Sequence, residues 1–259
     1  MKIATFNING VKARIEVLLR WLAATRPDVV CLQEIKSEDA GFPRGPIEDL
    51  GYRVETHGQK GFNGVAILSR LPISDLHRGL PGDPDDVQAR WIEATVEGRQ
   101  PVRIACLYAP NGNPAPGPKY DYKLAWMARM HARAKAMLAV EEPTVLAGDY
   151  NVIPTDLDAA RPAAWAEDAL ALAPSRAALR RIAHLGYDDA LRLRHPGAGV
   201  YTFWDYQAGA YARNDGIRID HLLLSPQAAD LLVDAGVDAA ERAGEKPSDH
   251  VPVWIELET

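Results

Sequence analysis

The chain has 259 residues and a formal net charge of -6, with 47% hydrophobic and 25% charged residues. These values exclude an intrinsically disordered chain, and the 20 Gly and 19 Pro follow no collagen-like period. A chain of this length can bury a large core as one domain or as two smaller ones. The negative charge argues weakly against a protein that coats nucleic acid through electrostatics alone, but it allows an enzyme that binds nucleic acid locally.

The first part of the chain predicts short β-strands around one amphipathic helix. Residues 2–6 and 29–33 are apolar runs that are typical of buried strands. Between them, residues 11–25 carry apolar side chains at helical spacing, which predicts a helix that Pro27 ends. Further strands are expected at 52–56, 64–69, 91–96 and 102–109.

The second part of the chain adds helices and closes with strands. A Gly/Pro-rich loop at 110–118 precedes a long helix predicted at 120–140. No segment resembles an interdomain linker or a repeat, so we expect one domain over residues 1–259, with sheets packed face to face and helices outside. The remaining expected elements are strands at 144–151, 218–225 and 251–258 and helices at 174–185 and 226–234.

The cysteines and the N-terminus indicate the cellular compartment. Cys31 and Cys106 both lie within apolar runs, so we expect buried, reduced thiols in strands. The sequence MKIATFNING lacks the apolar region and cleavage site of a signal peptide. No apolar run approaches the roughly 20 residues that span a bilayer. The sequence therefore predicts a cytoplasmic protein without membrane contact.

Polar residues recur at the points where apolar runs end or begin. Each one alone is typical of an ordinary turn or helix cap. Strand ends of one layer can nevertheless meet in space, and a rigid sheet edge can hold functional groups in place. The set contains four carboxylates, one histidine, three asparagines and one tyrosine: Asn7, Glu34, Tyr108, Asn111, Asp149, Asn151, Asp220, Asp249 and His250.

The composition of this set indicates a type of chemistry. Oxygen ligands without cysteine suit Mg²⁺ or Mn²⁺ rather than structural zinc. A carboxylate two residues from an amide, as in Asp149 and Asn151, can orient a water and donate a hydrogen bond to a phosphoryl oxygen. An Asp–His pair gives an imidazolium that can stabilise developing negative charge. The residues therefore predict metal-assisted hydrolysis of a phosphate ester.

Eight ordered motifs give the sequence a family resemblance over nearly its whole length. It resembles the exonuclease/endonuclease/phosphatase superfamily and, more closely, the exonuclease III family of abasic-site endonucleases. The resemblance implies an α/β fold of the four-layer sandwich type, with two mostly antiparallel β-sheets packed face to face and helices outside. The motifs are FNINGVKAR (6–14), PDVVCLQEIK (27–36), GQKGFNGVAILS (58–69), LYAPNG (107–112), GDYNVIPTDLD (148–158), TFWDY (202–206), NDGIRIDHLL (214–223) and EKPSDHVPV (245–253).

The resemblance also implies an activity and a partner. The expected enzyme is a DNA repair nuclease that depends on Mg²⁺, with Mn²⁺ as a substitute. It would hydrolyse the phosphodiester 5′ to abasic sites and trim 3′ ends as a 3′→5′ exonuclease and 3′-phosphatase, leaving 3′-hydroxyls. Its partner would be double-stranded DNA with abasic sites or blocked 3′ ends. We expect a monomer in the bacterial cytoplasm, associated with the nucleoid.

The family's metal-binding positions match five residues of this chain. Glu34 matches the principal metal ligand, and Asn7 matches an amide that lies near the metal and orients the catalytic aspartate. Asp249 matches a second carboxylate that often acts through water. Asp149 and Asn151 complete the implied metal site.

The implied catalytic groups overlap with this set. Asp149 matches the residue that positions or deprotonates the attacking water, or protonates the leaving oxygen. Asn151 matches a donor to a phosphoryl oxygen, and Tyr108 matches a phosphate-contacting group. Asp220 matches the carboxylate partner of the catalytic histidine, which is His250 here.

Further residues match the family's substrate contacts. Asn111 and Arg90 match phosphate-contacting groups. Phe203 and Trp204 match aromatic residues that form the wall of a pocket for an extruded abasic sugar, although this pair could also be simple core.

Two loops are expected to flank the DNA, one at 58–64 and one at 206–216. The segment after LYAPNG lacks the Arg that some animal relatives insert into DNA, so a wedge could come from 206–216 instead. The candidate phosphate contacts are Lys60, Arg213 and Arg218.

Two other functions compete with this interpretation. One is a phosphoesterase of the same superfamily that acts on a small-molecule or lipid phosphoester, and the segments TFWDY and NDGIRID argue against it. The other is a regulator that binds nucleic acid and has lost its catalytic site. In this chain every expected catalytic position is filled, so the sequence gives no sign of such a loss.

Overall fold

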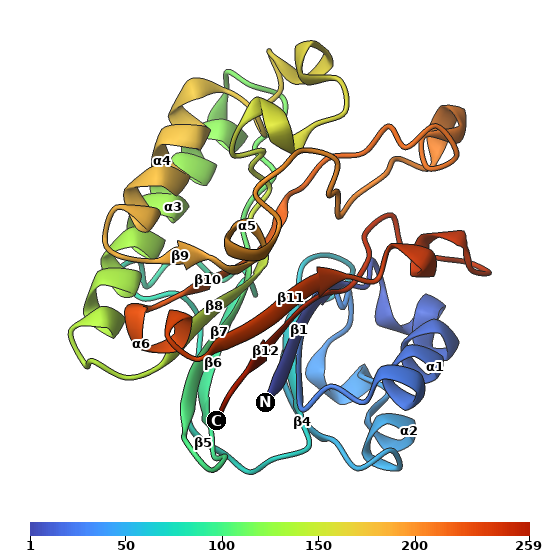
Figure 1. Ribbon diagram of the computed structural model, residues 1–259, viewed down its shortest axis with the longest axis vertical. Helices are drawn as coiled ribbons and strands as arrows, with labels where there is room; N and C mark the ends of the chain where they lie inside the picture. The colour runs from blue at the N-terminus through green and yellow to red at the C-terminus, as the bar shows by residue number, and fades with distance from the viewer.

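Two six-stranded β-sheets pack face to face, with helices on both outer faces (Figure 1). The computed structural model describes residues 1–259. This arrangement confirms the predicted layered α/β sandwich. None of the helices combines the length and the hydrophobicity that crossing a bilayer requires.

The first sheet contains the N-terminal and C-terminal strands of the chain. Only one of its neighbouring pairs, β1 and β2, is parallel; the other pairs are antiparallel. In spatial order its strands are β11 (Leu232–Val237), β12 (Val253–Leu257), β1 (Lys2–Asn7), β2 (Val29–Gln33), β4 (Val65–Ser69) and β3 (Arg53–His57).

The second sheet is built from the middle of the chain and repeats this pattern. Its single parallel pair is β7 and β8, so both sheets are mostly antiparallel, as predicted. In spatial order its strands are β5 (Ile73–Arg78), β6 (Trp91–Val96), β7 (Val102–Tyr108), β8 (Thr144–Asp149), β10 (Asp220–Leu224) and β9 (Asp188–Asp189).

Helices cover the outer face of each sheet. The first sheet is covered by α1 (Ile15–Thr25) and α2 (Arg44–Glu48), and the second by α3 (Pro118–Leu138) and α4 (Ala173–Ala183) (Figure 1). The shorter helices are α5 (Ala190–Arg194) and α6 (Pro226–Ala229). Single 3₁₀ turns are η1 (Val11–Arg14), η2 (Asp39–Gly41), η3 (Asp156–Asp158), η4 (Pro162–Trp165), η5 (Gln207–Gly209) and η6 (Ala239–Ala243).

Strand alternation creates three apolar layers, because successive side chains point to opposite faces of a strand. Ile3 and Ile104 belong to the layer between the sheets. Cys31 and Cys106 lie in the same layer as free, fully buried thiols, which confirms the prediction for the cysteines. Trp21 lies in the layer under α1, and Trp126 of α3 lies in the layer on the other outer face.

The carboxyl ends of the two parallel pairs meet in space. Strand β1 contacts β8, and β2 contacts both β7 and β8. A Cβ atom on Gly148 would lie 1.9 Å from the Leu107 carbonyl oxygen, so only glycine lets β8 pass β7 this closely. The next residue is Asp149, which pairs in register with Tyr108 on β7 and Asp220 on β10. The sheets therefore bring polar strand ends from both layers together.

Part of the element prediction is wrong. The helix expected at 226–234 stops after α6, and Leu232–Val237 form β11 instead. The open edge of β12 recruits this segment as a sheet edge, and tertiary pairing overrides the local helical preference. The first turn of the helix expected at 11–25 is the 3₁₀ turn η1. The sequence prediction also missed β5, β9, α2 and α5.

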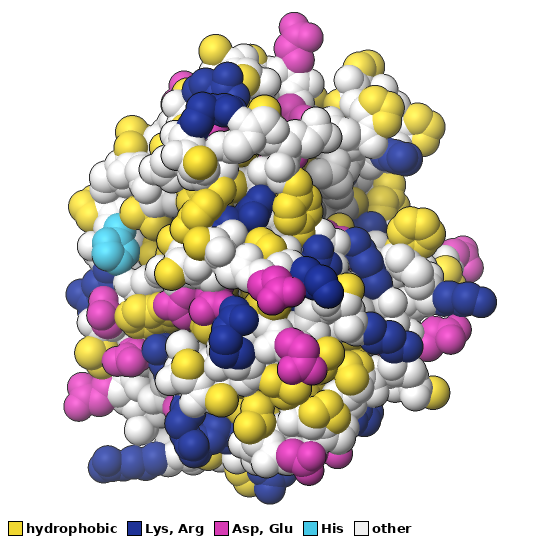
Figure 2. All heavy atoms as spheres, turned by 90° about the vertical axis from the view of Figure 1, so that its right-hand side faces the viewer, with side chains coloured by type: hydrophobic (Ala, Val, Ile, Leu, Met, Phe, Trp, Pro, Cys, Tyr) yellow, Lys and Arg dark blue, Asp and Glu magenta, His cyan; other side chains and the backbone are white.

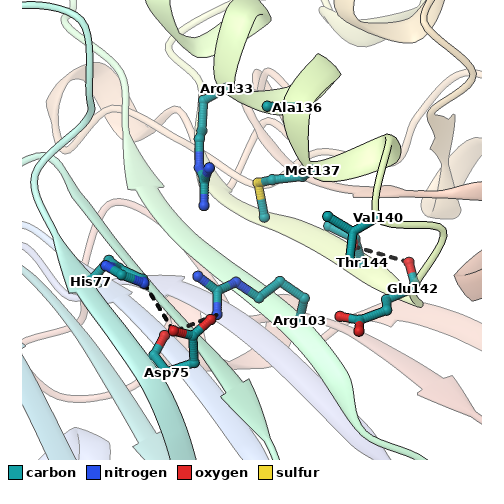
Figure 3. Close-up of a pocket in the computed structure, with 9 residues that line it drawn as sticks. All are labelled: Asp75, His77, Arg103, Arg133, Ala136, Met137, Val140, Glu142 and Thr144. Atoms are coloured by element: carbon teal, nitrogen blue, oxygen red, sulfur yellow. Dashed lines mark hydrogen bonds and ion pairs between the residues drawn. The ribbon is translucent and has the colours of Figure 1, made fainter.

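An ion-pair network ties α3 to the second sheet. Glu93 on β6 is 2% exposed and accepts hydrogen bonds from Arg103 on β7 (2.7 Å) and from Arg133 on α3. Figure 3 shows the neighbouring pocket, which Arg103 enters from the sheet and Arg133 from the helix, with Asp75 bonded to both Arg103 and His77. Burial raises the pKa of Glu93, but the hydrogen bonds from Arg133 and Arg103 outweigh it and hold the pKa below its usual value.

We expect Glu93→Gln to lower the free energy of unfolding by about 3 kcal/mol, because it leaves two guanidinium groups without their buried counter-charge. Urea denaturation measures this loss. Because the folded pKa is lowered, the stabilisation is present above the usual pKa of glutamate and is lost as the pH falls through the folded value.

Asp75→Asn is the matched control, because Asp75 also pairs with Arg103 but its side chain is 63% exposed. Solvent screens this pair, so the control should unfold at the wild-type urea concentration. Equal unfolding midpoints for Glu93→Gln and wild type would contradict the role of the network.

Candidate active site

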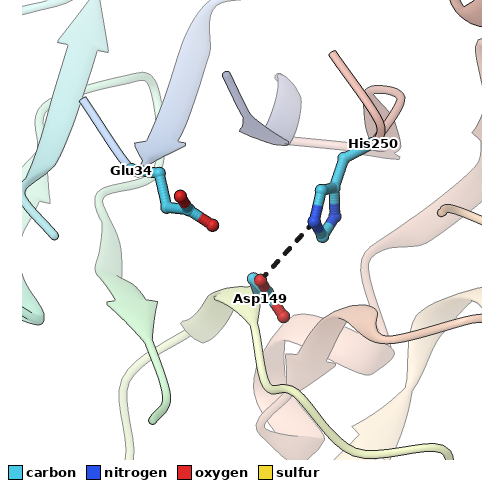
Figure 4. Close-up of side chains that lie close together, drawn as sticks. All are labelled: Glu34, Asp149 and His250. Atoms are coloured by element: carbon cyan, nitrogen blue, oxygen red, sulfur yellow. Dashed lines mark ion pairs between the residues drawn. The ribbon is translucent and has the colours of Figure 1, made fainter. Parts of the chain in front are cut away.

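Polar side chains from both sheets converge at the carboxyl ends of the two parallel pairs. Asn7 is the last residue of β1, and Glu34 directly follows β2. Asp149 is the last residue of β8, and His250 precedes β12. Figure 4 shows Glu34, Asp149 and His250 pointing toward one another from these separate segments. The convergence expected from the strand ends is therefore present in the structure.

Two of the converging residues have unusual backbone conformations. Glu34 has φ 50° and Asn151 has φ 48°, in the left-handed region that side chains other than glycine rarely adopt. The backbone at Glu34 is held by hydrogen bonds from Gly10 N to Glu34 O (2.7 Å) and from Ile35 N to Gly64 O (3.1 Å). Such conformations persist only where the surroundings fix them, and they cluster at functional sites.

Asn7 holds two carboxylates in place. Its Nδ2 group donates to Glu34 Oε1 (2.9 Å) and to Asp149 Oδ2 (3.0 Å). Its Oδ1 atom accepts the backbone N–H of Asn9 (3.0 Å) and so faces away from the carboxylates. In this arrangement Asn7 orients Glu34 and Asp149 with its amide nitrogen, while its oxygen is directed away from the space between the two carboxylates.

His250 is the cationic member of a buried pair. Its Nδ1 lies 2.8 Å from Asp220 Oδ2, and its Nε2 lies 3.8 Å from Asp149 Oδ2. Burial lowers the pKa of His250, but the charge and hydrogen bond of Asp220, with the charge of Asp149, outweigh it and raise the pKa to about 10. Thr202 Oγ1 also donates to Asp220 Oδ2 (2.6 Å) and fixes this carboxylate. The ring is therefore an imidazolium at neutral pH.

Asp149 lies at the centre of the site. Burial raises its pKa to about 7; the charges of Asp220 and Glu34 act in the same direction, whereas His250 and the Asn151 N–H oppose the shift. The Asn151 backbone N–H donates to Asp149 Oδ1 (2.8 Å). Neighbouring positive charge would therefore decide whether this group is a carboxylate near neutral pH.

The side chain of Asn151 belongs to a chain of amides beside Asp149. Its Nδ2 donates to the Ala109 carbonyl (2.9 Å), and its Oδ1 accepts Asn111 Nδ2 (3.1 Å). Asn111 is exposed at the rim of the site. The two asparagines thus form a row that leads from the buried carboxylate to the surface.

The carboxylates of Glu34 and Asp149 fit a divalent cation. One ligand atom each from Glu34, Asp149 and His250 lies within 4.8 Å of the others. The His250 ring is protonated and bonded to Asp220, so the carboxylate oxygens are the available ligands. Burial raises the pKa of Glu34, but hydrogen bonds from Asn7 and Lys36 lower it below the usual value, so Glu34 is charged. An oxygen-only donor set suits a hard cation.

Asp249 lies beside this cluster. Its Oδ1 accepts Asn9 Nδ2 (3.0 Å), while Asn9 Oδ1 accepts Lys36 Nζ (2.6 Å). Lys36 in turn lies 2.9 Å from Glu34 Oε2. Asp249 is therefore linked to Glu34 through two intermediate side chains, which is compatible with an indirect role in cation binding.

Tyr108 and Arg90 lie together near the cluster. The Arg90 guanidinium lies 4.8 Å from the centre of the Tyr108 ring. Burial and the charges of Glu34 and Asp149 raise the pKa of Tyr108 well above its usual value, so its hydroxyl stays protonated. Arg90 and Asn111 also line a cavity of about 530 Å³ with the exposed Lys119. The expected phosphate contacts thus share one side of the site.

A cavity with a mixed apolar and charged lining opens beside Phe203, which packs against His250. Phe203 packs edge-on against the His250 ring, with 5.0 Å between ring centres. Phe203 lines a cavity of about 270 Å³ together with Trp165 and Ile217. The expectation for Trp204 is wrong: its side chain is buried on another side, against Tyr201 and Tyr211. Neighbouring residues of an extended segment point in opposite directions, which separates Phe203 from Trp204.

The three basic residues expected to contact DNA differ in accessibility. Lys60 is exposed in its loop, and Arg213 is exposed beside the Phe203 cavity. The expectation for Arg218 is wrong, because this side chain is 1% exposed. It forms ion pairs with Asp158 (2.7 Å) and Asp189 (2.6 Å) and thereby holds the loop after β8 against β9.

Sequence reasoning missed three residues of the site: Lys36, Trp165 and Ile217. The signal for Lys36 was its place two residues after Glu34, within the motif that carried the metal ligand. Ile217 alternates with Ile219 ahead of Asp220, a pattern that marks one face of an extended segment. Trp165 lies in a segment rich in alanine and proline, where no local pattern indicates a cavity wall.

Comparison with known proteins agrees with this geometry. Exodeoxyribonuclease III of Haemophilus influenzae is 36% identical over 266 residues, which cover 99% of this chain and 100% of the relative. An AP endonuclease from Archaeoglobus fulgidus has a TM-score of 0.95 and 36% identity, with both chains covered in full.

The 3′ phosphatase NExo from Neisseria, solved with a product DNA hairpin, has a TM-score of 0.95 and 38% identity, again with full coverage of both chains. Residues 4–250 match the endonuclease/exonuclease/phosphatase family. The chain therefore belongs to the endonuclease/exonuclease/phosphatase family.

Proposed function

We propose that this protein is a metal-dependent DNA repair nuclease that hydrolyses the phosphodiester 5′ to abasic sites and removes blocking groups from 3′ ends. The observation that carries the proposal is the buried pair of His250 and Asp220, which directs a protonated ring at Asp149 across from Glu34. An acid, a carboxylate that can orient water and a second carboxylate that can bind a cation, all held around one point, suit metal-assisted hydrolysis of a phosphate ester.

The chain's own groups divide the chemistry between them. Asp220 fixes the ring of His250, so that its Nε2–H can donate to a phosphoryl oxygen and stabilise the charge that develops there. Asn151 Nδ2 lies 3.4 Å from Asp149 Oδ2 and would supply a second donor to a phosphoryl oxygen bound beside this carboxylate. Asp149 is placed to orient the attacking water and to take its proton, and Asn7 keeps Asp149 in position.

We assign the cation to Glu34 and Asp149, with Asp249 acting indirectly, and propose Mg²⁺ with Mn²⁺ as a substitute. A cation bound there would polarise a phosphoryl oxygen and lower the cost of burying two carboxylates side by side. The positive charge would also favour the ionised form of Asp149, which is the form that can accept a proton.

The proposed substrate is double-stranded DNA with abasic sites or blocked 3′ ends. Support comes from the names of the relatives, exodeoxyribonuclease III, AP endonuclease and 3′ phosphatase. The cavity beside Phe203, where Trp165 and Ile217 form an apolar wall within a partly charged lining, also suits a sugar without a base, which costs least to extrude. On the face in Figure 2 basic and acidic side chains are interspersed, which favours local contacts over a broad basic surface.

The proposal extends to the organisation of the protein. We propose one domain over residues 1–259 and a monomer that works in the bacterial cytoplasm at the nucleoid. Support for a monomer comes from the two edge strands of the first sheet, β3 and β11. Side chains of the same chain bond edge carbonyl groups there, which hinders edge-to-edge pairing with a second copy. Arg78 Nε donates to Thr56 O on β3 (2.6 Å), and the His195 ring bonds Ala235 O on β11 (2.8 Å).

The first test removes the acid–base groups. We expect Asp149→Asn and His250→Ala each to reduce the cleavage rate of an abasic duplex by at least about 100-fold, because positioned proton transfer and charge stabilisation each contribute on this scale. Gel analysis of the incised strand measures the rate. The control is Asp156→Asn, which alters an exposed acid that pairs with Arg176 outside the site and should leave the rate unchanged.

The second test removes the cation. EDTA should abolish cleavage, and Mg²⁺ or Mn²⁺ should restore it. Glu34→Gln should raise the Mg²⁺ concentration for half-maximal rate by roughly 10- to 100-fold, because it deletes a charged ligand. Full cleavage in chelator, or an unchanged Mg²⁺ requirement in the variant, would refute the metal assignment.

The third test compares substrates for one preparation. An abasic duplex and a duplex with a 3′-phosphate should be hydrolysed with larger kcat/KM than an undamaged blunt duplex. Neither the abasic site nor the 3′-phosphate requires a paired base to be unstacked before hydrolysis. An inositol phosphate serves as the small phosphoester. Preferred hydrolysis of the inositol phosphate would favour the alternative phosphoesterase, and no hydrolysis of any substrate would favour a non-catalytic binding protein.

A further inference from the structure

A buried lysine that the proposed chemistry does not use lies beneath the asparagine row. Lys123 belongs to the second turn of α3, and its side chain is fully buried (0% exposed). Its Nζ donates to Asn111 O (3.0 Å), Asn151 O (2.6 Å) and Ala169 O (3.1 Å). An ammonium carries three N–H donors and no acceptor, so each donor is matched to one carbonyl.

The three carbonyls belong to three different segments. Asn111 follows β7, Asn151 follows β8, and Ala169 lies in the turn before α4. The same segments are also joined by amide side chains, from Asn111 Nδ2 to Asn151 Oδ1 (3.1 Å) and from Asn113 Nδ2 to Asp168 Oδ1 (3.0 Å). Lys123 therefore fixes the backbone of the loops whose asparagine side chains face the site.

Burying the Lys123 side chain carries both a cost and a gain in free energy. Burying a charged ammonium is costly unless hydrogen bonds and nearby charge compensate it. Burial lowers the pKa of Lys123 to about 7, although the charges of Asp149 and Asp168 oppose the shift. All three hydrogen-bond partners of Lys123 are neutral carbonyl oxygens. An apolar side chain of the same length would avoid this cost but would leave the Asn111 and Asn151 carbonyls without the donor that Lys123 supplies. What the ammonium adds is a fixed mutual position for three loops.

This position matters for the carboxylate at the centre of the site. The Asn151 backbone N–H donates to Asp149 Oδ1 (2.8 Å), and the Asn151 carbonyl is bonded to Lys123 (2.6 Å). A shift of the peptide units around Asn151 would move its amide and turn the Asp149 carboxylate at the same time. Displacements of about 1 Å around reacting groups can cost a hundredfold in rate.

We propose that Lys123 is a positioning residue for phosphodiester hydrolysis, whose ammonium fixes the loops of Asn111 and Asn151 in the geometry that the reaction needs. The inference rests on the proposed function, because it concerns the rate of that reaction. Lys123 itself does not contact the substrate, since its side chain is closed off from solvent.

The test uses the full chain with Mg²⁺ and a duplex with a 3′-phosphate. We expect Lys123→Met to lower kcat by about 10- to 100-fold, with KM changed by less than about threefold, because the substrate contacts remain while the reacting groups lose alignment. Lys123→Arg should recover part of the lost kcat, because a guanidinium restores donors to the carbonyls.

The matched control is Met130→Ala on the same helix. Met130 is fully buried in the apolar layer under α3 and contacts none of the three carbonyls through hydrogen bonds. It should lower the melting temperature while kcat stays within about twofold of wild type. A wild-type kcat in folded Lys123→Met would overturn the proposal. Should Lys123→Met not fold, Lys123→Gln, which keeps two donors, replaces it under the same criterion.

Amide hydrogen exchange separates this inference from the proposed function. In Lys123→Met, exchange should be faster than in Met130→Ala at Asn151 N and at Ala169 N, which donate to Asp149 Oδ1 and Asn113 Oδ1. Unchanged exchange at both sites would refute the positioning role. Faster exchange in a protein whose wild type cleaves no DNA would refute the proposed function and leave the loop anchoring by Lys123 in place.

Discussion

The arrangement of the site is governed by one constraint: several carboxylates lie close together at a place shielded from water. The carboxylates of Glu34, Asp149 and Asp220 share one site, and like charges in a medium of low dielectric repel strongly. The His250 ring, the Asn7 amide and backbone N–H groups compensate part of this repulsion. All these groups lie at or next to strand ends. The packing of the two sheets therefore fixes the donors and the cationic ring beside the carboxylates.

The main features of the fold and the site could be predicted from the sequence because they depend on short-range patterns. A polar residue directly after an apolar run, such as Glu34 after residues 29–33, has its depth and direction set by the strand. Asp149 and His250 are defined in the same way by the runs beside them. Helices and strands with strong periodicity, such as α1 and β7, were placed correctly within a few residues.

The remainder depends on contacts between distant segments. In the sequence, Arg218 looks like an exposed basic residue. Only the three-dimensional positions of Asp158 and Asp189 show that it is buried and neutralises these two carboxylates. Lys123 lies in a helix of mixed polarity, and nothing in the neighbouring sequence indicates that its ammonium donates to three carbonyls of distant segments. Strand β11 forms because β12 offers an edge, and that edge does not exist until the sheet is assembled.

The order of the strands along the chain has a consequence for biosynthesis. The whole second sheet, from β5 to β10, is inserted between β4 and β11, and β12 then fits between β11 and β1. A nascent chain that has grown only to residue 249 therefore lacks both His250 and a central strand of the first sheet. Such a partial chain would therefore lack the proposed acid and could not complete the first sheet.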